Sequence, residues 1–503
     1  MPSSGATGVP ASRKYPSVYT QVAFGASPNT AGGAPRRVLM LANKTSAGSA
    51  TVDSVIYGPL TPDTAKDYGG VGSEFHLGAI AAAALEPGAE VYGIAVTESA
   101  GVKAAQTLTV AGGAAGGDGN LAIRIHGVVV NVSIISGLSA ANAGIAIKNA
   151  INGTITPLNV TAADNGAGLV TITARHNGTR GNDIAITITK DASITTQTYT
   201  LGGAKLTGGT LTDSISAALT TASVKKFDYV ALAQVDTTNL QLFQTKALAN
   251  AGPLVRKRMV GISWNADTQG NATTQATTLN EPLLQILWQK KGECIPIQAT
   301  AGWAARRSVR ESDEPNYHLS LFNPDAVDLH AIIPSPELTS DWMLESEAAT
   351  VLDVGLTPVI TRSTDGHPMV ALSITSHSQD SLGNPDARTL TTNYVIVPFH
   401  WADEVEAFIP TNFPGMYLRD DPVEGDEPLP PNTITPLAIE GFLKDLYKRK
   451  YDLTGQVKNF DSDTATWQVN IDANNPNRVD STMEVTPSPW FTQFSSRILQ
   501  LTP

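Results

Sequence analysis

Short apolar runs of the kind found in buried strands alternate with helical patterns along much of the chain. Such runs occupy residues 37–42, 90–96 and 226–233. Between the first two runs, Pro62 opens a short helix, and an Ala-rich helix is expected over residues 74–85. Strands that alternate with helices in this way imply a mostly parallel sheet covered on both faces.

The same alternation resumes near residue 206. Asp213 is placed to cap a helix over residues 214–222, because its side chain can accept a hydrogen bond from the first turn. The further elements expected in this half are a strand over residues 258–263 and helices over residues 238–249, 299–309 and 341–353.

Residues 98–205 interrupt the alternation with a pattern of their own. A hairpin is expected to turn near His126, and a second hairpin turns at Asp-Asn-Gly over residues 164–166. A helix over residues 140–151 lies between them, and a strand over residues 184–188 follows. The pattern predicts a compact α+β module of about five strands and one helix, inserted at an exposed loop of the larger domain.

The pattern changes toward strands from residue 367 onward. Strands are expected over residues 369–374 and 393–399, and a third over residues 467–472. An acidic, Pro-rich loop and an amphipathic helix over residues 436–450 lie between the second and the third. This region is therefore predicted to form an α+β C-terminal domain.

Both ends of the chain are predicted to be extended arms. Residues 1–35 are rich in Ser, Gly, Ala and Pro and cannot bury enough apolar surface to order themselves alone. Strand-like stretches at residues 16–24 and 494–501 could each pair with a strand of another chain. The residues expected to lie in such subunit-interface strands are Val18, Tyr19, Gln21, Val22, Phe494, Ser496, Ile498, Leu499 and Leu501.

The predicted fold class is an α/β core with a mostly parallel or mixed sheet flanked by helices, a small inserted α+β module, an α+β C-terminal domain and two extended arms. The expected divisions are an N-terminal arm (1–35), a discontinuous core (36–97 and 206–366), the insert (98–205), a C-terminal domain (367–486) and a C-terminal arm (487–503).

Composition narrows the classes of partner. Of 503 residues, 16% are charged, against about 25% in a typical globular protein. The net charge of −12 argues against nucleic acid as the main partner, because phosphate binding needs a basic face. Basic clusters at residues 256–258, 306–310 and 448–450 have two readings: solvated ends of elements, or contacts with acidic patches such as residues 420–427 on identical copies.

The sequence indicates folding in a cytoplasm. The single cysteine, Cys294, excludes an intramolecular disulfide and is expected to be a small buried hydrophobe in a strand-like run over residues 293–297. Residues 1–14 lack the apolar stretch of a secretory signal. No membrane span is expected, because the best apolar run, over residues 77–96, is broken by charges, Pro and Gly.

No constellation of reactive residues rises above background. Three histidines and three aspartates fall in one region of the sequence, but none has the spacing of a metal site. These residues are His367, His377, His400, Asp365, Asp380 and Asp403. The segment around Ser263 lacks the second glycine of a nucleophile elbow, and the Gly-rich residues 112–117 lack the lysine of a phosphate loop. We therefore expect no enzyme activity, catalytic residue, metal or cofactor.

Four stretches carry a resemblance to a known family. They are residues 16–19 with 36–41, residues 68–73 with the Ala-rich helix and residues 90–92, residues 169–184, and residues 356–376. In their order along the chain and in their residue patterns, they resemble the tail sheath proteins of contractile bacteriophages, especially Mu-like phages. The resemblance rests on segment order more than on any rigid motif.

The resemblance implies a structural subunit that polymerises helically around a tail tube and contracts to drive the tube through the host envelope. It implies four partners: identical copies, joined through exchange of terminal strands, the tail tube protein, the baseplate proteins and the tail terminator protein. It also implies assembly in the host cytoplasm and a final place in the virion tail.

Two other functions fit the residues. One is a surface-displayed adhesin or carbohydrate-binding protein with the insert as its binding face, against which the absence of a signal peptide weighs. The other, with the least support, is a hydrolase.

Overall fold

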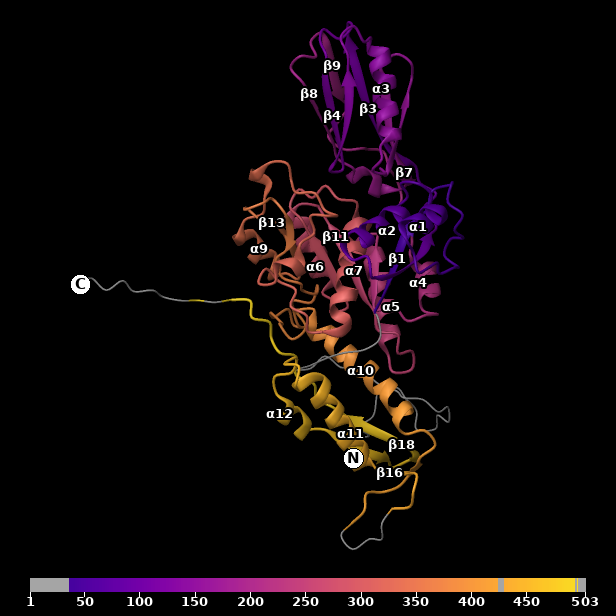
Figure 1. The fold of residues 1–503 in the computed structure, drawn as a ribbon, viewed down its shortest axis with the longest axis vertical. Helices are drawn as coiled ribbons and strands as arrows, with labels where there is room; N and C mark the ends of the chain where they lie inside the picture. The colour runs from indigo at the N-terminus through magenta and orange to yellow at the C-terminus, as the bar shows by residue number, and fades with distance from the viewer. Residues whose placement is uncertain (1–35, 424–428, 494, 496–503) are drawn as a thin grey trace, which may run out of the picture.

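The computed structural model describes residues 36–423, 429–493 and 495. These residues form three parts along the long axis of the molecule (Figure 1). The insert stands at one end, the central sheet with its helices lies in the middle, and the C-terminal helices and hairpins lie at the other end.

Seven strands form the central sheet in the order β14-β13-β12-β11-β10-β1-β2. They are β1 (Arg37–Asn43), β2 (Glu90–Val96), β10 (Tyr229–Leu232), β11 (Val260–Asn265), β12 (Leu284–Trp288), β13 (Thr357–Thr361) and β14 (Pro368–Val370). All neighbouring strands run parallel except β13 and β14. Every residue of β10 and β12 is buried, as expected where helices cover both faces of a parallel sheet. The predicted α/β arrangement with a mixed, mostly parallel sheet is confirmed.

Helices surround the sheet, and two of them pack closely over one face. The elements are α1 (Pro62–Gly69), α2 (Glu74–Leu85), α4 (Ser216–Ala222), α5 (Thr237–Ala251), α6 (Gln269–Leu279), α7 (Pro296–Asp313), α8 (Pro324–Val327), the 3-10 turn η2 (Thr339–Asp341) and α9 (Glu345–Leu352). Gly78 on α2 permits the close approach of α7, because a β-carbon there would lie 2.8 Å from the side chains of Ile297 and Met40.

Two local predictions in this part are wrong. Helix α4 begins at Ser216 and has no side-chain cap, so Asp213 is not its N-cap. The Asp213 carboxylate instead accepts hydrogen bonds from the insert, where a charged partner is available. Cys294 is buried as expected, but the run around it is not a strand, because Pro296 begins α7.

The insert has its own hydrophobic core and two sheets, in the orders β6-β7-β3-β9 and β5-β4-β8. Its elements are β3 (Lys103–Gly112), β4 (Gly119–Ile125), β5 (Val128–Ile134), α3 (Ala140–Gly153), β6 (Val160–Asp164), β7 (Leu169–Asn177), the 3-10 turn η1 (Thr179–Asp183), β8 (Ile186–Lys190) and β9 (Gln197–Leu201). It therefore holds more strands than the predicted five. The two extra strands, β3 and β9, consist mostly of Ala, Thr, Gln and Gly and have only two large apolar residues each, so their strand pattern is weak in sequence.

The C-terminal part contains α10 (Asn393–Asn412), β15 (Tyr417–Leu418), β16 (Thr433–Ile434), α11 (Pro436–Tyr447), a π-helical turn η3 (Lys448–Asp452), α12 (Phe460–Ala465), β17 (Gln468–Asp472) and β18 (Asn475–Thr482). The predicted helix over residues 436–450 and strand over residues 467–472 agree with α11, η3 and β17. Trp401, Tyr447, Tyr451 and Trp467 pack their rings together in the core of this part.

The predicted strand over residues 393–399 is wrong, because these residues open helix α10. Ile396 and Phe399 pack into the central core, whereas Val397 and Trp401 pack into the C-terminal core. A helix buried on two sides shows no polar face, so its sequence looks like a continuous apolar strand. The predicted strand over residues 369–374 is also shorter than expected: β14 ends at Val370, and only single bridges continue beyond it.

Candidate functional site

The candidate site is a set of assembly surfaces, because the sequence pointed to strand exchange at the two ends. All nine predicted interface residues, Val18, Tyr19, Gln21, Val22, Phe494, Ser496, Ile498, Leu499 and Leu501, lie outside the described residues. The structure does describe the points at which both arms leave the folded part.

The first described residue, Arg36, is fixed in the core. Its guanidinium lies 2.9 Å from Asp228 and also donates a hydrogen bond to His400 of α10, and its backbone N–H donates to Ser312 over 3.1 Å. The side chain is 5% exposed. Burial alone would lower the pKa of Arg36, but Asp228 and the other nearby acids raise it overall. The root of the N-terminal arm is therefore a buried arginine that pairs with Asp228 beside the central sheet and reaches the C-terminal part through its hydrogen bond to His400.

The last described segment is held against a loop of the central part. The Trp490 indole N–H donates to the Asn316 carbonyl over 3.0 Å, and the Phe491 carbonyl lies 3.2 Å from Nε2 of His318. The Phe491 ring also packs on Phe322, with ring centroids 5.3 Å apart. The last described residues are thus fixed by an aromatic anchor on the central part (Figure 1).

A two-stranded sheet lies in the C-terminal part. Strands β17 and β18 pair antiparallel from Gln468↔Thr482 to Asp472↔Asn475. Among the described residues, no third strand pairs with either of them. A two-stranded hairpin is marginally stable in water on its own, and its outer edges are the places where further strands add.

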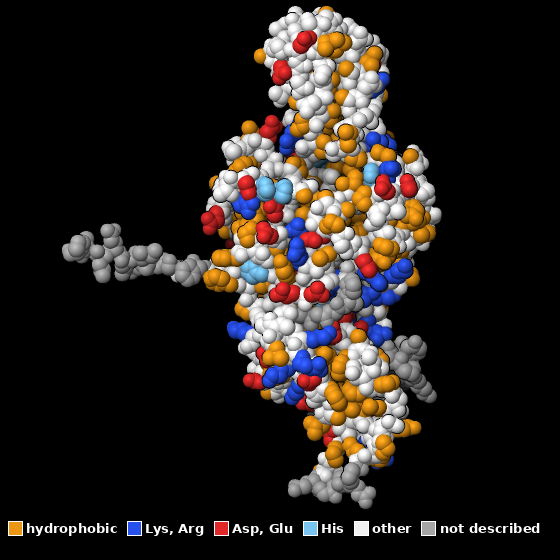
Figure 2. Space-filling model, in the orientation of Figure 1, with side chains coloured by type: hydrophobic (Ala, Val, Ile, Leu, Met, Phe, Trp, Pro, Cys, Tyr) orange, Lys and Arg blue, Asp and Glu red, His pale blue; other side chains and the backbone are white. Residues whose placement is uncertain are grey.

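Exposed apolar side chains gather on the C-terminal part, at the lower end of the molecule in Figure 2. Tyr417 is 72% exposed, Leu437 is 63% exposed and Phe442 is 50% exposed. Large exposed apolar groups that lie together are typical of interaction surfaces.

The junction between the insert and the central part is a buried charge network. Arg180 in turn η1 of the insert forms ion pairs with Glu74 at the start of α2 and with Asp213. The same guanidinium donates to the Asn43 side-chain carbonyl over 3.0 Å. His176 accepts a hydrogen bond from the Glu74 backbone N–H over 3.2 Å. One arginine of the insert therefore meets two carboxylates of the central part in a largely buried site.

The charges of this network are mutually stabilised. Burial would raise the pKa of Glu74, but Arg180 and then His176 lower it overall. Burial would likewise lower the pKa of Arg180, but Glu74 and Asp213 raise it. On the other side of the junction, Arg124 pairs with Glu293 over 2.6 Å. The insert is thus docked at two points instead of being tethered by loops alone.

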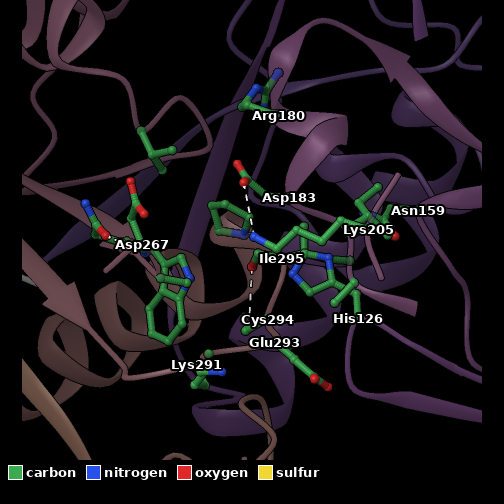
Figure 3. A pocket seen from close by; sticks show the side chains of 18 of the residues that line it. His126, Asn159, Arg180, Asp183, Lys205, Asp267, Lys291, Glu293, Cys294 and Ile295 are labelled. Carbon is green, nitrogen blue, oxygen red and sulfur yellow. Dashed lines mark hydrogen bonds and ion pairs between the residues drawn. The ribbon is translucent and has the colours of Figure 1, made fainter. Parts of the chain in front are cut away.

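Between these two points lies a cavity of about 540 Å³ (Figure 3). Lys205 extends across it toward Asp183, with the charged atoms 3.6 Å apart. Within the described part, His126 Nδ1, Asn159 Oδ1 and Trp264 Nε1 line this cavity as buried polar atoms with no hydrogen-bond partner from the protein. Burial lowers the pKa of His126 to about 4, so its ring is neutral at physiological pH. The space suits ordered water bridging these groups.

The one thiol that lines this cavity, Cys294, is not suited to act as a nucleophile. Burial raises the pKa of the Cys294 thiol to about 12, which keeps the sulfur protonated and weakly nucleophilic.

The three histidines that lie close in sequence are not brought together. His367 pairs with Asp328, His377 meets Thr389, and His400 meets Arg36. Of the aspartates, Asp403 pairs with Arg258 and Lys226, Asp365 with Arg362, and Asp380 with Asn384. Of these six residues, His367 and Asp365 lie next to each other, with Nδ1 of His367 3.8 Å from Oδ2 of Asp365.

Among the described residues, no helix combines the length and the apolar character needed to cross a membrane.

Comparison with known proteins points to phage tails. No family model matches the chain. The Mu-like prophage FluMu tail sheath protein of Haemophilus influenzae is 25% identical over 329 residues, which is 64% of this chain and 63% of that protein. The chain thus matches less than two thirds of the length of this curated relative.

Two solved sheath tail proteins are also similar in structure. That of Desulfitobacterium hafniense has a TM-score of 0.47 and 13% identity, covering 92% of this chain and 99% of its own. That of Listeria innocua has a TM-score of 0.44 and 13% identity, covering 92% and 94%. By sequence, the class to which the chain is similar is that of prophage tail proteins. Within that class, the predicted resemblance to the contractile tail sheath proteins of Mu-like phages is confirmed.

Proposed function

We propose that the chain is a structural subunit of a contractile phage tail sheath, which polymerises helically around the tail tube and contracts to drive the tube through the host envelope. The observation that carries this proposal is the 25% identity over 329 residues with a Mu-like prophage tail sheath protein. The other partners proposed from the resemblance are the tail tube protein, the baseplate proteins and the tail terminator protein, in a virion tail assembled in the host cytoplasm.

Assembly is proposed to proceed by strand exchange at the β17–β18 hairpin. The strand-like residues 16–24 of one copy and 494–501 of another would each add to an outer edge of the hairpin in a neighbour. About four to six backbone hydrogen bonds per added strand, at about 0.5–1.5 kcal/mol net each, give a few kcal/mol per junction. A contact that joins different surfaces of identical copies does not close on itself, so it produces a helix.

The domain divisions are proposed to match different roles. The core (36–97 and 206–366) and the C-terminal domain (367–486) would line the interior of the sheath, while the insert (98–205) would project outward. The insert and the C-terminal part lie at opposite ends of the molecule, which supports this orientation (Figure 1).

The arms are proposed to keep neighbours joined while the copies rotate. Arg36 and Trp490 anchor the two roots. The Gly- and Pro-rich composition of residues 27–35 is that of a linker that would let neighbours turn relative to each other. Contraction would then draw its energy from many small differences in subunit contact, each row releasing the next.

Negative-stain electron microscopy of the full chain and of a chain reduced to residues 36–493 tests this proposal. We expect helical tubes or rings from the full chain and discrete particles with unchanged circular dichroism from the reduced chain. A point variant sharpens the test: Gln21→Pro removes a ladder hydrogen bond inside the predicted strand and should impair assembly. The matched control, Ser4→Pro, lies in the same arm outside that strand and should assemble normally.

Normal polymers from the reduced chain or from Gln21→Pro would contradict strand exchange. A full chain that remains a monomer under every condition would contradict the sheath proposal and favour the adhesin alternative.

A further inference from the structure

Two loops far apart in sequence bring two histidines and one carboxylate together on the surface of the central part. Asp328 and His330 follow helix α8, and His367 follows the turn between β13 and β14. Nδ1 of His330 lies 2.8 Å from Oδ1 of Asp328, and Nδ1 of His367 lies 2.8 Å from Oδ2 of the same carboxylate. One ligand atom from each of the three residues falls within 4.8 Å of the others.

The backbone fixes both loops in place. The Leu329 N–H donates to the Pro368 carbonyl over 2.8 Å, and Asp328 forms a bridge with Met369. The turn before His367 is closed by the Arg362 N–H, which donates to the His367 carbonyl over 2.8 Å. The three side chains therefore belong to one small framework and not to two independently moving loops.

The side chains are of the types that bind a borderline divalent cation. Two imidazoles and one carboxylate make a three-ligand set that leaves a fourth position open, an arrangement common for zinc. Ligand atoms around a tetrahedral zinc lie about 3.3 Å apart, so separations of 2.8 Å are within reach. The imidazole rings stack with centroids 4.0 Å apart, and His330 is 56% exposed, so a small rotation can turn both nitrogens toward one ion.

The carboxylate of Asp328 lies between the two imidazoles, with one oxygen near each ring nitrogen. A carboxylate and two ring nitrogens that converge in this way attract a dication.

We propose that Asp328, His330 and His367 form a binding site for a zinc-type divalent cation. The ion would clip the loop after α8 to the β13–β14 turn. Water or the nearby carboxylate of Asp365 would complete its coordination.

Arg362 opposes the binding of a cation, whereas the carboxylate of Asp365 could assist it. Arg362 lies 4.0 Å from Asp328 and is paired with Asp365. Its positive charge repels a dication and also occupies the extra carboxylate. Removing this charge should therefore strengthen binding, whereas removing an imidazole should weaken it.

Isothermal titration of the chelator-treated full chain with zinc chloride at pH 7.5 tests the proposal, with magnesium chloride as the ion control. We expect one zinc per chain and no magnesium binding, because nitrogen ligands select zinc. His330→Gln and His367→Gln should each weaken zinc binding at least about tenfold, and Arg362→Gln should strengthen it several-fold. His377→Gln is the matched control, since His377 contacts Thr389 away from the cluster and should leave the affinity unchanged.

Thermal melts in chelator establish that the variants fold, and the gain expected of Arg362→Gln cannot arise from misfolding. Zinc binding that persists in both histidine variants, or that falls equally in His377→Gln, would overturn the proposal.

Discussion

The buried contact of Arg180 with Glu74 and Asp213 predicts a large effect for one substitution. In Arg180→Ala, the two carboxylates remain in a site where the Glu74 side chain is 8% exposed and that of Asp213 is 1% exposed. Their only other polar support among the described residues comes from neutral groups such as Asn43 and the N–H of Ser99, and from His176. The variant thus leaves two like charges side by side without their cation.

Removing one partner of a buried ion pair costs about 3–5 kcal/mol of the free energy of unfolding. The loss should depend on pH. In the native chain the pKa of Glu74 is lowered, so this group stabilises the fold above its ordinary pKa of 4.5, and the contribution is lost as the pH falls through the folded value. Without Arg180, burial would raise the pKa, and the group would destabilise the fold as the pH rises. The difference between variant and native chain should therefore widen from pH 5 to pH 8.

Chemical unfolding of the chain reduced to residues 36–493, monitored by circular dichroism at pH 5 and pH 8, measures this difference. Hydrogen exchange at residues 74–78 and 176–184 locates the change at the junction. The matched control is Arg449→Ala, because Arg449 pairs with Asp445 at the surface, where the side chains are 60% and 57% exposed. An exposed pair of this kind contributes about 0.3–0.5 kcal/mol.

A loss at pH 8 no larger than that of Arg449→Ala would refute the argument that burial makes this ion pair important for stability. A loss of the same size at both pH values would refute the assignment of the effect to unpaired carboxylates.

Two further predictions concern the core and the insert. Burial raises the pKa of Glu281 to about 7. Between pH 4.5 and pH 7 this group therefore ionises in the unfolded chain but stays protonated in the folded one, so the native chain loses stability as the pH rises. Glu281→Gln cannot ionise, and its stability relative to the native chain should rise by up to about 3 kcal/mol from pH 5 to pH 8 in urea titrations; a constant difference would contradict this. Replacing residues 100–203 by a short linker should preserve folding and assembly. This deletion exposes Glu74 and Asp213 to water, so in thermal unfolding it should lower the stability less than Arg180→Ala does. An insoluble or unfolded product would argue against an inserted decoration.

The central sheet was predictable because its strands carry the signal that burial on both faces requires. Residues 226–233 and 258–263 are nearly continuous apolar runs, and they contain β10 and most of β11. The same rule failed at residues 393–399, where a doubly buried helix gives the same run. It also missed β9, whose Gln-Thr-Tyr-Thr-Leu sequence has little apolar character.

The junction and the cation cluster were not predictable, because both depend on contacts between distant segments. Asp213 has the local context of a helix cap, and only the fold reveals that Arg180 competes for it. The one available signal was an arginine in a turn of small and polar residues, at 178–183, where an isolated charge needs a partner. His367 was considered with its sequence neighbours, and of these only Asp365 lies beside it. Asp328 and His330 are brought to it by the pairing of Leu329 with Pro368.

The two segments that connect the insert to the core run next to each other. The Val102 N–H donates to Thr210 Oγ1 over 3.1 Å, and the Thr210 N–H donates to the Val102 carbonyl over 3.3 Å. Any foreign domain whose own ends are similarly close could be grafted at this neck without stretching the sheet beneath it. In a polymer of such copies, each graft would be displayed at the regular spacing of the lattice, so the neck is a natural attachment point for engineered cargo.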